Sequence, residues 1–284
     1  MTYRPLIVIG AARSGTKLLR DLIAAHDGAD KVPFDVNYLW RLGNEKWPDD
    51  ELTPAMLTPA VRSRIQQQIS RHHAGAPWLV EKTVSNCLRV PFVQAVFPEA
   101  RYVHLVRDGR DVVESVVRQW NAKPDWRYIL RKAYTYPIRE AFGYGVSYGF
   151  SLLHRLLTPQ QKSRFVWGPR YAGIDVDLAR KALPEVCALQ WLRCVESASR
   201  DLAQQIPAER LLTLRYETLV EEPKGCLEQV ADLLQIDPEP YRRPELLSTV
   251  SRTYVGRGRY TLSNDDWQCA MPHLNRGLAL LGYA

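Results

Sequence analysis

Two widely separated segments constrain the fold most, because each one reads as a buried strand that runs into a polar turn and then into a helix. The first is the apolar run Leu6-Ile7-Val8-Ile9 followed by Gly10-Ala11-Ala12-Arg13-Ser14-Gly15-Thr16-Lys17. The second is Tyr102-Val103-His104-Leu105-Val106 followed by Arg107-Asp108-Gly109-Arg110-Asp111-Val112-Val113-Glu114-Ser115. Backbone N–H groups at a helix N-terminus bind phosphate. Together the segments predict a nucleotide with phosphates at two positions.

The rest of the chain continues the alternation of strands and helices. Further strands are expected at 78–82 and 210–217, and helices after the first loop to about His26, from Val90 to Phe97, from Asp108 as N-cap, and at 187–205. Such alternation predicts an α/β protein with a three-layer, P-loop-like fold, in which helices flank a central parallel sheet. Ligands of such sheets bind at the carboxyl ends of the strands. The residues expected to converge at this edge are Arg13, Lys82, Arg107 and Tyr216.

One stretch, residues 118–173, differs in character because it is rich in Trp, Tyr and Phe. Its rings either pack an extra helical layer or wall an acceptor pocket above the edge of the sheet. We expect a helical insertion within a single domain that spans residues 1–284, since nothing in the composition divides the chain.

Composition narrows the class of ligand. The formal net charge is +7, but Lys and Arg are scattered along the chain, which favours a phosphate-rich small molecule over nucleic acid. The five cysteines have no paired spacing that would indicate a disulfide framework or a zinc site. A signal sequence and an apolar stretch long enough to span a membrane are not recognisable. We therefore expect a cytoplasmic protein without a membrane span.

The first loop departs from the ATP-binding pattern Gly-x-x-x-x-Gly-Lys-Ser/Thr. Here Thr16 follows Gly15 and Lys17 comes only after it, so the lysine is one position too late to reach the outer phosphates. The third expected strand, at 102–106, runs into Arg107, whereas a kinase or nucleotide hydrolase would need a carboxylate there for magnesium. A basic residue at this position suits an anion, and no metal is expected.

With these motifs, the sequence resembles the sulfotransferases that use 3'-phosphoadenosine 5'-phosphosulfate (PAPS). The resemblance rests on five segments in the same order along the chain, namely residues 13–16, 81–83, 107–115, 215–217 and 255–259. It is closer to the bacterial and tyrosylprotein-type branch than to the cytosolic branch, because Val84 stands where cytosolic relatives carry a histidine after the Lys-Thr pair.

The resemblance implies a role for each matching residue. The 5'-phosphosulfate end of PAPS would be held by Arg13, Ser14, Gly15, Thr16 and Lys17, and the 3'-phosphate by Arg107 and Ser115. Tyr216 would lie near the adenine, and a loop of Gly256, Arg257, Gly258 and Arg259 would close over the 3'-phosphate, unless it is an ordinary solvated basic turn. Arg13 and Lys82 would stabilise the charge of the transferring sulfuryl group, although Lys82 could instead pair with Glu81.

The general base is the least determined role. Asp35 matches the carboxylate that the tyrosylprotein enzymes place after the first helix, and it could accept the proton of the acceptor, but it could equally be a turn or cap residue. Glu81 is a weaker candidate because it is expected to point away from Lys82 along the strand. His104 is expected to be buried within a strand, and His72 and His73 to lie on the surface.

These expectations add up to an enzyme that moves a sulfuryl group from PAPS to a hydroxyl of a small molecule or glycoside and releases the 3',5'-bisphosphate PAP. The alternatives are a P-loop kinase or nucleotide hydrolase, and a non-enzymatic module that binds nucleotides or nucleic acid. The sequence indicates neither the acceptor nor the oligomeric state.

Overall fold

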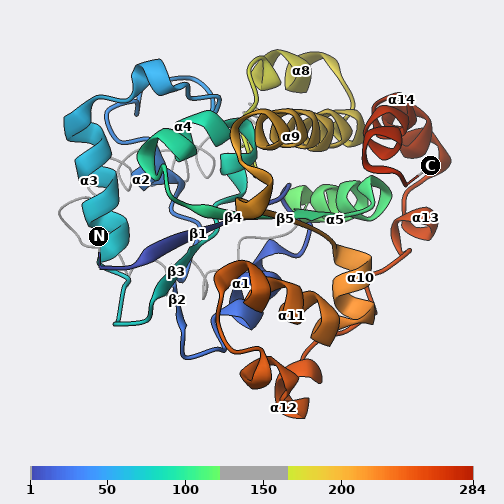
Figure 1. The fold of residues 1–284 in the computed structure, drawn as a ribbon. Helices are drawn as coiled ribbons and strands as arrows, with labels where there is room; N and C mark the ends of the chain where they lie inside the picture. Colours follow the sequence, from blue (N-terminus) through green and yellow to red (C-terminus); the bar gives the residue numbers. More distant parts are fainter. Residues whose placement is uncertain (1, 122–165, 284) are drawn as a thin grey trace. The chain divides into compact units, whose positions relative to one another are not determined.

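A computed structural model describes residues 2–121 and 166–283, and its described part contains a five-stranded parallel sheet (Figure 1). The strand order is β2-β3-β1-β4-β5. The strands are β1 (Arg4–Ile9), β2 (Ala29–Lys31), β3 (Trp78–Glu81), β4 (Arg101–Val106) and β5 (Leu211–Arg215). The α/β prediction is therefore confirmed, and four of the strands lie where the apolar runs predicted them. The short edge strand β2 was not predicted, since its sequence Ala-Asp-Lys carries no apolar alternation.

Helices cover both faces of this sheet (Figure 1). α1 and α11 lie on one face, and α4, α5 and α9 lie on the other. The helices described are α1 (Thr16–Ile23), α2 (Asn37–Trp40), α3 (Pro59–Ser70), α4 (Val90–Val96), α5 (Gly109–Asn121), α8 (Ile174–Arg180), α9 (Leu183–Gln205), α10 (Tyr216–Glu221), α11 (Pro223–Leu234), α12 (Pro244–Leu247), α13 (Gly258–Thr261) and α14 (Asn264–Leu281). Shorter 3-10 turns are η1 (Pro54–Met56), η2 (Val84–Leu88), η3 (Ala208–Arg210) and η4 (Glu239–Arg242). This is the three-layer arrangement that the sequence predicted.

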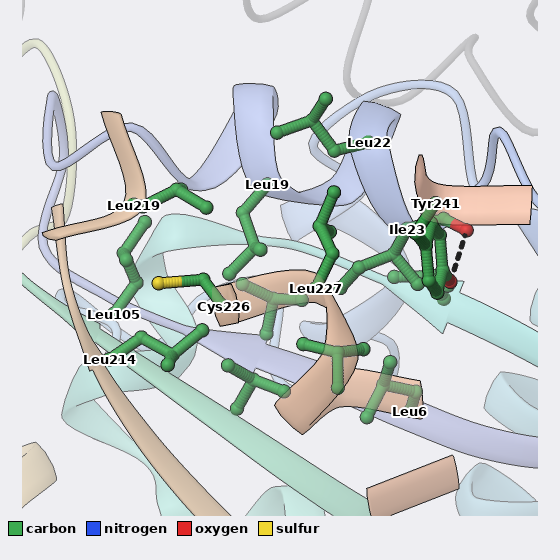
Figure 2. Packing of buried hydrophobic residues seen from close by; sticks show 14 of the residues in the cluster. Leu6, Leu19, Leu22, Ile23, Leu105, Leu214, Leu219, Cys226, Leu227 and Tyr241 are labelled. Carbon is green, nitrogen blue, oxygen red and sulfur yellow. Dashed lines mark hydrogen bonds between the residues drawn. The ribbon is translucent and has the colours of Figure 1, made fainter. Parts of the chain in front are cut away.

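The core beneath α1 and α11 fixes the helix that follows the first loop (Figure 2). Leu19, Leu22 and Ile23 of α1 are fully or almost fully buried with Leu227 of α11. The hydroxyl of Tyr241 donates a hydrogen bond of 2.9 Å to the carbonyl of Ile23, which ends the last turn of α1. Truncation of one such leucine to alanine typically costs about 2–5 kcal/mol. Packing along one side of α1 thus fixes this helix in the core.

The register of the sheet places the polar loops side by side. Ile7 pairs with Glu81 of β3 and with Tyr102 of β4, so β1 lies between the strands that precede Lys82 and Arg107. Val106 in turn pairs with Arg215 of β5, which precedes Tyr216. Since all the strands are parallel, the loops that follow them meet at one edge, as the sequence predicted.

Two compact units divide the chain, one of residues 1–117 and 168–284 and the other of residues 118–167. The aromatic insertion predicted at 118–173 falls mostly on residues 122–165, which lie outside the described residues. Its helical character and its role in an acceptor pocket stay predictions, as does the assignment of the whole chain to a single domain.

Candidate functional site

The loop between β1 and α1 has the backbone of an anion-binding turn. Arg13 and Gly15 both have positive φ values, 68° and 89°, and Gly15 is the N-cap of α1 without any side-chain cap among the described residues. A Cβ atom on Gly10 would lie 2.7 Å from the carbonyl oxygen of Leu105, so the loop passes close to β4. Ser14 and Thr16 are buried, whereas Lys17 is exposed at the first turn of α1. The uncapped first turn directs N–H groups out of the helix.

Arg13 joins this loop to the segment that follows β4. Its Nε donates a hydrogen bond of 2.9 Å to Oγ of Ser115 on α5. The Nη1 of Arg107 donates one of 3.0 Å to the carbonyl oxygen of Arg13. Hydrogen bonds therefore link Arg13, Arg107 and Ser115, which the resemblance assigns to the two phosphates of a nucleotide, although they come from two separate segments.

Arg107 is the buried centre of this group. Its side chain is 7% exposed, its Cζ lies 4.1 Å from the centroid of the Tyr216 ring, and its Nη2 donates to the carbonyl oxygen of Tyr254 at 2.5 Å. The remaining donor, Nε, is buried and has no hydrogen-bond partner among the described residues. A buried donor left without an acceptor is costly. This nitrogen therefore points to an anionic ligand.

Tyr216 is buried against the loop between β1 and α1. It is 5% exposed, and a Cβ atom on Gly15 would overlap its ring. Burial raises the pKa of its hydroxyl. The predicted contact of Tyr216 with an adenine is not tested by this packing, which shows a ring that supports Gly15 on one side and Arg107 on the other.

A second loop, residues 254–258, is attached to the N-terminus of α5 by Asp111. One carboxylate oxygen of Asp111 accepts a hydrogen bond of 2.8 Å from the N–H of Gly256, and the other accepts one of 2.8 Å from the N–H of Gly258. A Cβ atom on Gly258 would overlap the backbone of Arg110, so this position requires glycine. Arg257 is exposed, and the side chain of Arg259 lies outside the described part of the chain.

The sequence did not indicate this role of Asp111. Asp111 is 3% exposed, and its carboxylate lies 3.6 Å from Nη2 of Arg107. The available signal was the short spacing, because Arg107 lies just before the expected helix and Asp111 lies in its first turn.

Lys82 and Asp35 form the third part of the site. The Nζ of Lys82 donates to both carboxylate oxygens of Asp35, at 2.8 and 3.0 Å, and the N–H of Val84 donates to Asp35 at 3.1 Å. The Lys82 side chain is 6% exposed and that of Asp35 is 35% exposed. The alternative pairing of Lys82 with Glu81 is not what the structure contains. The predicted cation and the predicted base lie together, one covered and the other open to solvent.

Glu81 points away from Lys82 into the protein, as strand alternation predicted. It is completely buried, and burial is the main reason that its pKa is raised to about 7. Its carboxylate accepts hydrogen bonds from the Thr83 hydroxyl at 2.5 Å, the Asn86 amide at 3.0 Å and the Trp40 indole at 3.2 Å. His104 is also buried, and burial lowers its pKa to about 4.

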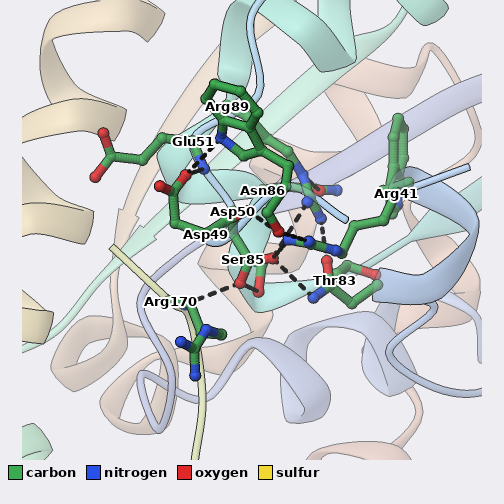
Figure 3. A network of polar contacts seen from close by, with 12 residues as sticks. Arg41, Asp49, Asp50, Glu51, Thr83, Ser85, Asn86, Arg89 and Arg170 are labelled. Atoms are coloured by element: carbon green, nitrogen blue, oxygen red, sulfur yellow. Dashed lines mark hydrogen bonds and ion pairs between the residues drawn. The ribbon is translucent and has the colours of Figure 1, made fainter. Parts of the chain in front are cut away.

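A buried polar network is centred on Asp50 (Figure 3). Asp50 is 1% exposed and accepts hydrogen bonds of 3.0, 3.1, 2.8 and 2.9 Å from the Asn37 amide, Arg41 Nη1, the Ser85 hydroxyl and the Arg170 backbone N–H. Arg89 lies 3.7 Å from it. The network ties α2, η2 and the chain at residue 170 to one buried carboxylate. No sequence pattern indicated it.

The described residues include no group of three or more His, Cys, Asp or Glu side chains suited to hold a metal ion. None of the helices in the described ranges is long and apolar enough to cross a membrane.

Comparison with known proteins tests the resemblance found in the sequence. Residues 5–142 match the family model described as "Sulfotransferase family". A putative protein-tyrosine sulfotransferase of Caenorhabditis briggsae is 28% identical over 124 residues, which cover 41% of this chain and 44% of that protein. Human protein-tyrosine sulfotransferase 1 is 31% identical over 125 residues, covering 40% of this chain and 34% of that protein. The match thus spans less than half the length of these relatives.

Solved structures share the fold over nearly the whole chain. Sulfotransferase STF9 from Mycobacterium avium superimposes with a TM-score of 0.59 at 12% identity and covers 99% of this chain and 77% of its own. The sulfotransferase domain of the curacin biosynthetic pathway gives 0.53 at 18% identity, with 99% and 98% covered. A mouse sulfotransferase solved in complex with PAP gives 0.51 at 13% identity, with 99% and 89% covered. These structures share the fold of the chain, and the match of residues 5–142 to the sulfotransferase family model confirms the resemblance found in the sequence.

Proposed function

We propose that this protein transfers a sulfuryl group from PAPS to a hydroxyl group of an acceptor. The observation that carries the proposal is the link between the two anion-binding loops, in which Arg13 donates to Ser115 while Arg107 donates to the carbonyl of Arg13. A nucleotide with phosphates at both ends of its ribose needs two such sites close together, whereas a nucleoside triphosphate needs only one.

The donor would be held by backbone and guanidinium groups. The uncapped first turn of α1, with Ser14, Gly15, Thr16 and Lys17, suits the 5'-phosphosulfate end. Arg107 and Ser115 suit the 3'-phosphate, and the unpartnered Nε of Arg107 is a donor available to it. The loop with Gly256, Arg257, Gly258 and Arg259 would cover that end, and Tyr216 would lie near the adenine.

The transfer itself would use Asp35, Lys82 and Arg13. The acceptor oxygen forms a bond to sulfur in line with the sulfur–oxygen bond that breaks, and PAP leaves with the electron pair of that bond. Negative charge grows on the leaving phosphate and on the sulfuryl oxygens, and the cations of Lys82 and Arg13 stabilise it. Asp35 is the more exposed member of its pair with Lys82 and takes the proton of the acceptor hydroxyl. Fixed cations take the place that a metal ion has in kinases.

The acceptor we propose is a hydroxyl of a small molecule or glycoside in a cytoplasmic setting. The relatives named protein-tyrosine sulfotransferase favour a second candidate, a tyrosine side chain of a peptide. An acceptor screen with a phenol, an aryl glycoside and a tyrosine-containing acidic peptide, each with PAPS, separates these two candidates.

The experiment that tests the donor site is calorimetric titration of the metal-free protein with PAP, with ATP plus magnesium as the comparison. Tight binding of PAP without magnesium is expected. Arg107→Ala should weaken PAP binding at least 30-fold, which is about 2 kcal/mol, because two charge-assisted hydrogen bonds and the support of the loop are lost. Arg242→Ala removes an equal charge from an exposed arginine and is the matched control. Magnesium-dependent binding of ATP alone would instead support a kinase.

A further inference from the structure

The segments that carry Asp35 and Lys82 are joined by a chain of buried hydrogen bonds that ends at Glu81. Thr83 follows Lys82 directly, and its hydroxyl accepts a hydrogen bond of 3.0 Å from the N–H of Val36, the residue after Asp35. The same hydroxyl donates to Glu81 at 2.5 Å. Glu81, Thr83 and Val36 are each no more than 4% exposed. The geometry of the proposed base therefore depends on a carboxylate that does not face the site.

The hydrogen bonds around an ionised Glu81 have defined directions. The Arg89 Nε donates to the Asn86 Oδ1 at 2.9 Å, so the amide nitrogen of Asn86 must face Glu81. The Trp40 indole can only donate. The Thr83 oxygen accepts from the Val36 N–H, and its proton is donated to the ionised carboxylate of Glu81, which can only accept. All three groups around Glu81 are thus donors, and an ionised carboxylate satisfies all of them.

We propose that Glu81 is a positioning residue for the transfer reaction: through the Thr83 hydroxyl it holds the backbone at Asp35 in register with Lys82. The inference rests on the proposed function, because it assigns to Asp35 and Lys82 the roles given above. Glu81 itself touches neither substrate in this arrangement and is not a second base.

A consequence is that the site should respond to the protonation of Glu81. A protonated carboxyl must donate at one oxygen, whereas Thr83, Asn86 and Trp40 all donate to Glu81, so one of these contacts is lost or, at Thr83, reversed. The hydrogen bonding of the hydroxyl that holds Val36 then changes. The charged groups around Glu81 are Lys82 and Asp35 on one side and Arg89 on the other, with Asp50 and Arg41 beyond Arg89. Burial raises the pKa of Glu81 to about 7, which places this change near neutral pH.

The first test isolates the hydroxyl link. Thr83→Val keeps the shape of the side chain but removes the hydroxyl, and Thr83→Ser restores it. Ser85→Ala is the matched control, because it deletes another buried hydroxyl, one that donates to Asp50 at 2.8 Å and does not contact Val36. We expect Thr83→Val to lower kcat at least 10-fold with unchanged acceptor KM and PAP affinity, to raise amide hydrogen exchange at residues 35–37, and to be rescued by Thr83→Ser. Unchanged exchange and kcat in Thr83→Val would overturn the proposal.

The second test follows the ionisation of Glu81 and needs no enzymatic turnover. The indole N–H of Trp40 should show a chemical-shift titration near neutral pH in ¹⁵N-labelled protein, and Glu81→Gln should abolish it while PAP still binds. In the acceptor assay, Glu81→Gln should lower the plateau of kcat and move the acid limb of its pH profile to lower pH. A Trp40 titration that persists in Glu81→Gln would refute the role of Glu81. Failure of the wild-type protein to bind PAP would refute the proposed function and would leave the exchange and Trp40 measurements still decisive for the positioning role.

Discussion

Replacement of Asp111 by asparagine tests how the loop at 254–258 is held over the site. The carboxylate of Asp111 accepts one backbone N–H on each oxygen, from Gly256 and Gly258, both at 2.8 Å. Asp111→Asn changes one of these oxygens into an NH2 group that must face a backbone donor. It also removes the negative charge 3.6 Å from Arg107. The side chain keeps its size, so packing is not disturbed.

The magnitude follows from these contacts. One hydrogen bond to a charged acceptor contributes about 1.5–3 kcal/mol, and the stranded N–H is buried, so docking of the loop should be weakened by about 3 kcal/mol. Arg107 itself keeps its contacts with the Arg13 carbonyl and the Tyr216 ring and stays in place. If the loop closes over the 3'-phosphate, the full loss of docking free energy lowers the affinity for PAP, which should fall about 100-fold.

The assay is calorimetric titration with PAP, combined with amide hydrogen exchange of the loop. Asp265→Asn changes an exposed aspartate of α14 in the same way and should leave both measurements as in the wild type. Unchanged or tighter binding of PAP to Asp111→Asn would refute the reasoning. Tighter binding in particular would mean that Asp111 competes with the phosphate for Arg107 and does not position the loop.

Two further predictions concern the other carboxylates. Asp35→Asn should spare PAP binding but lower kcat at least 100-fold, because the amide cannot take the acceptor's proton; normal turnover, measured with the acceptor found in the screen, would exclude Asp35 as the base. Glu81→Gln should cost more stability, relative to the wild type, at pH 5 than at pH 7. The folded-state pKa of Glu81 is raised from 4.5 to about 7, so its stabilising contribution is present below pH 4.5 and is lost as the pH rises through 7. Between pH 5 and pH 7 the difference amounts to about 2 kcal/mol in urea unfolding, and an equal loss at both pH values would show that Glu81 does not titrate in this range.

The elements that the sequence predicted well are those whose apolar pattern is local. The runs at Leu6–Ile9 and Tyr102–Val106 are continuous and end in polar turns, and a parallel sheet brings such ends together whatever the side chains are. The convergence of Arg13, Lys82, Arg107 and Tyr216 follows from this topology. The edge strand at Ala29–Lys31 has no such pattern, because one face of so short a strand contributes little to the core.

The pairings within the site could not be predicted in the same way. Whether Lys82 meets Glu81 or Asp35 depends on the path of the chain between β2 and α2, which brings Asp35 within 2.8 Å of Lys82 although the two are far apart in sequence. The network of Asp50 joins four segments, and its residues are individually ordinary polar side chains. Long-range hydrogen bonds of this kind leave no periodicity in a sequence.

The two halves of the site nevertheless follow one physical rule. In the absence of an anionic substrate, neighbouring cationic side chains repel one another and are costly to bury. Each therefore needs a nearby carboxylate that positions it without fully neutralising its charge. The carboxylate of Asp111 lies 3.6 Å from Arg107, which is longer than a direct hydrogen bond. Its two oxygens accept hydrogen bonds from the backbone of the loop at 254–258. Glu81 lies on the far side of the backbone from Lys82 and acts through Thr83. Asp35 is the exception, since it contacts Lys82 directly and is 35% exposed, which suits the proton transfer that we propose for it.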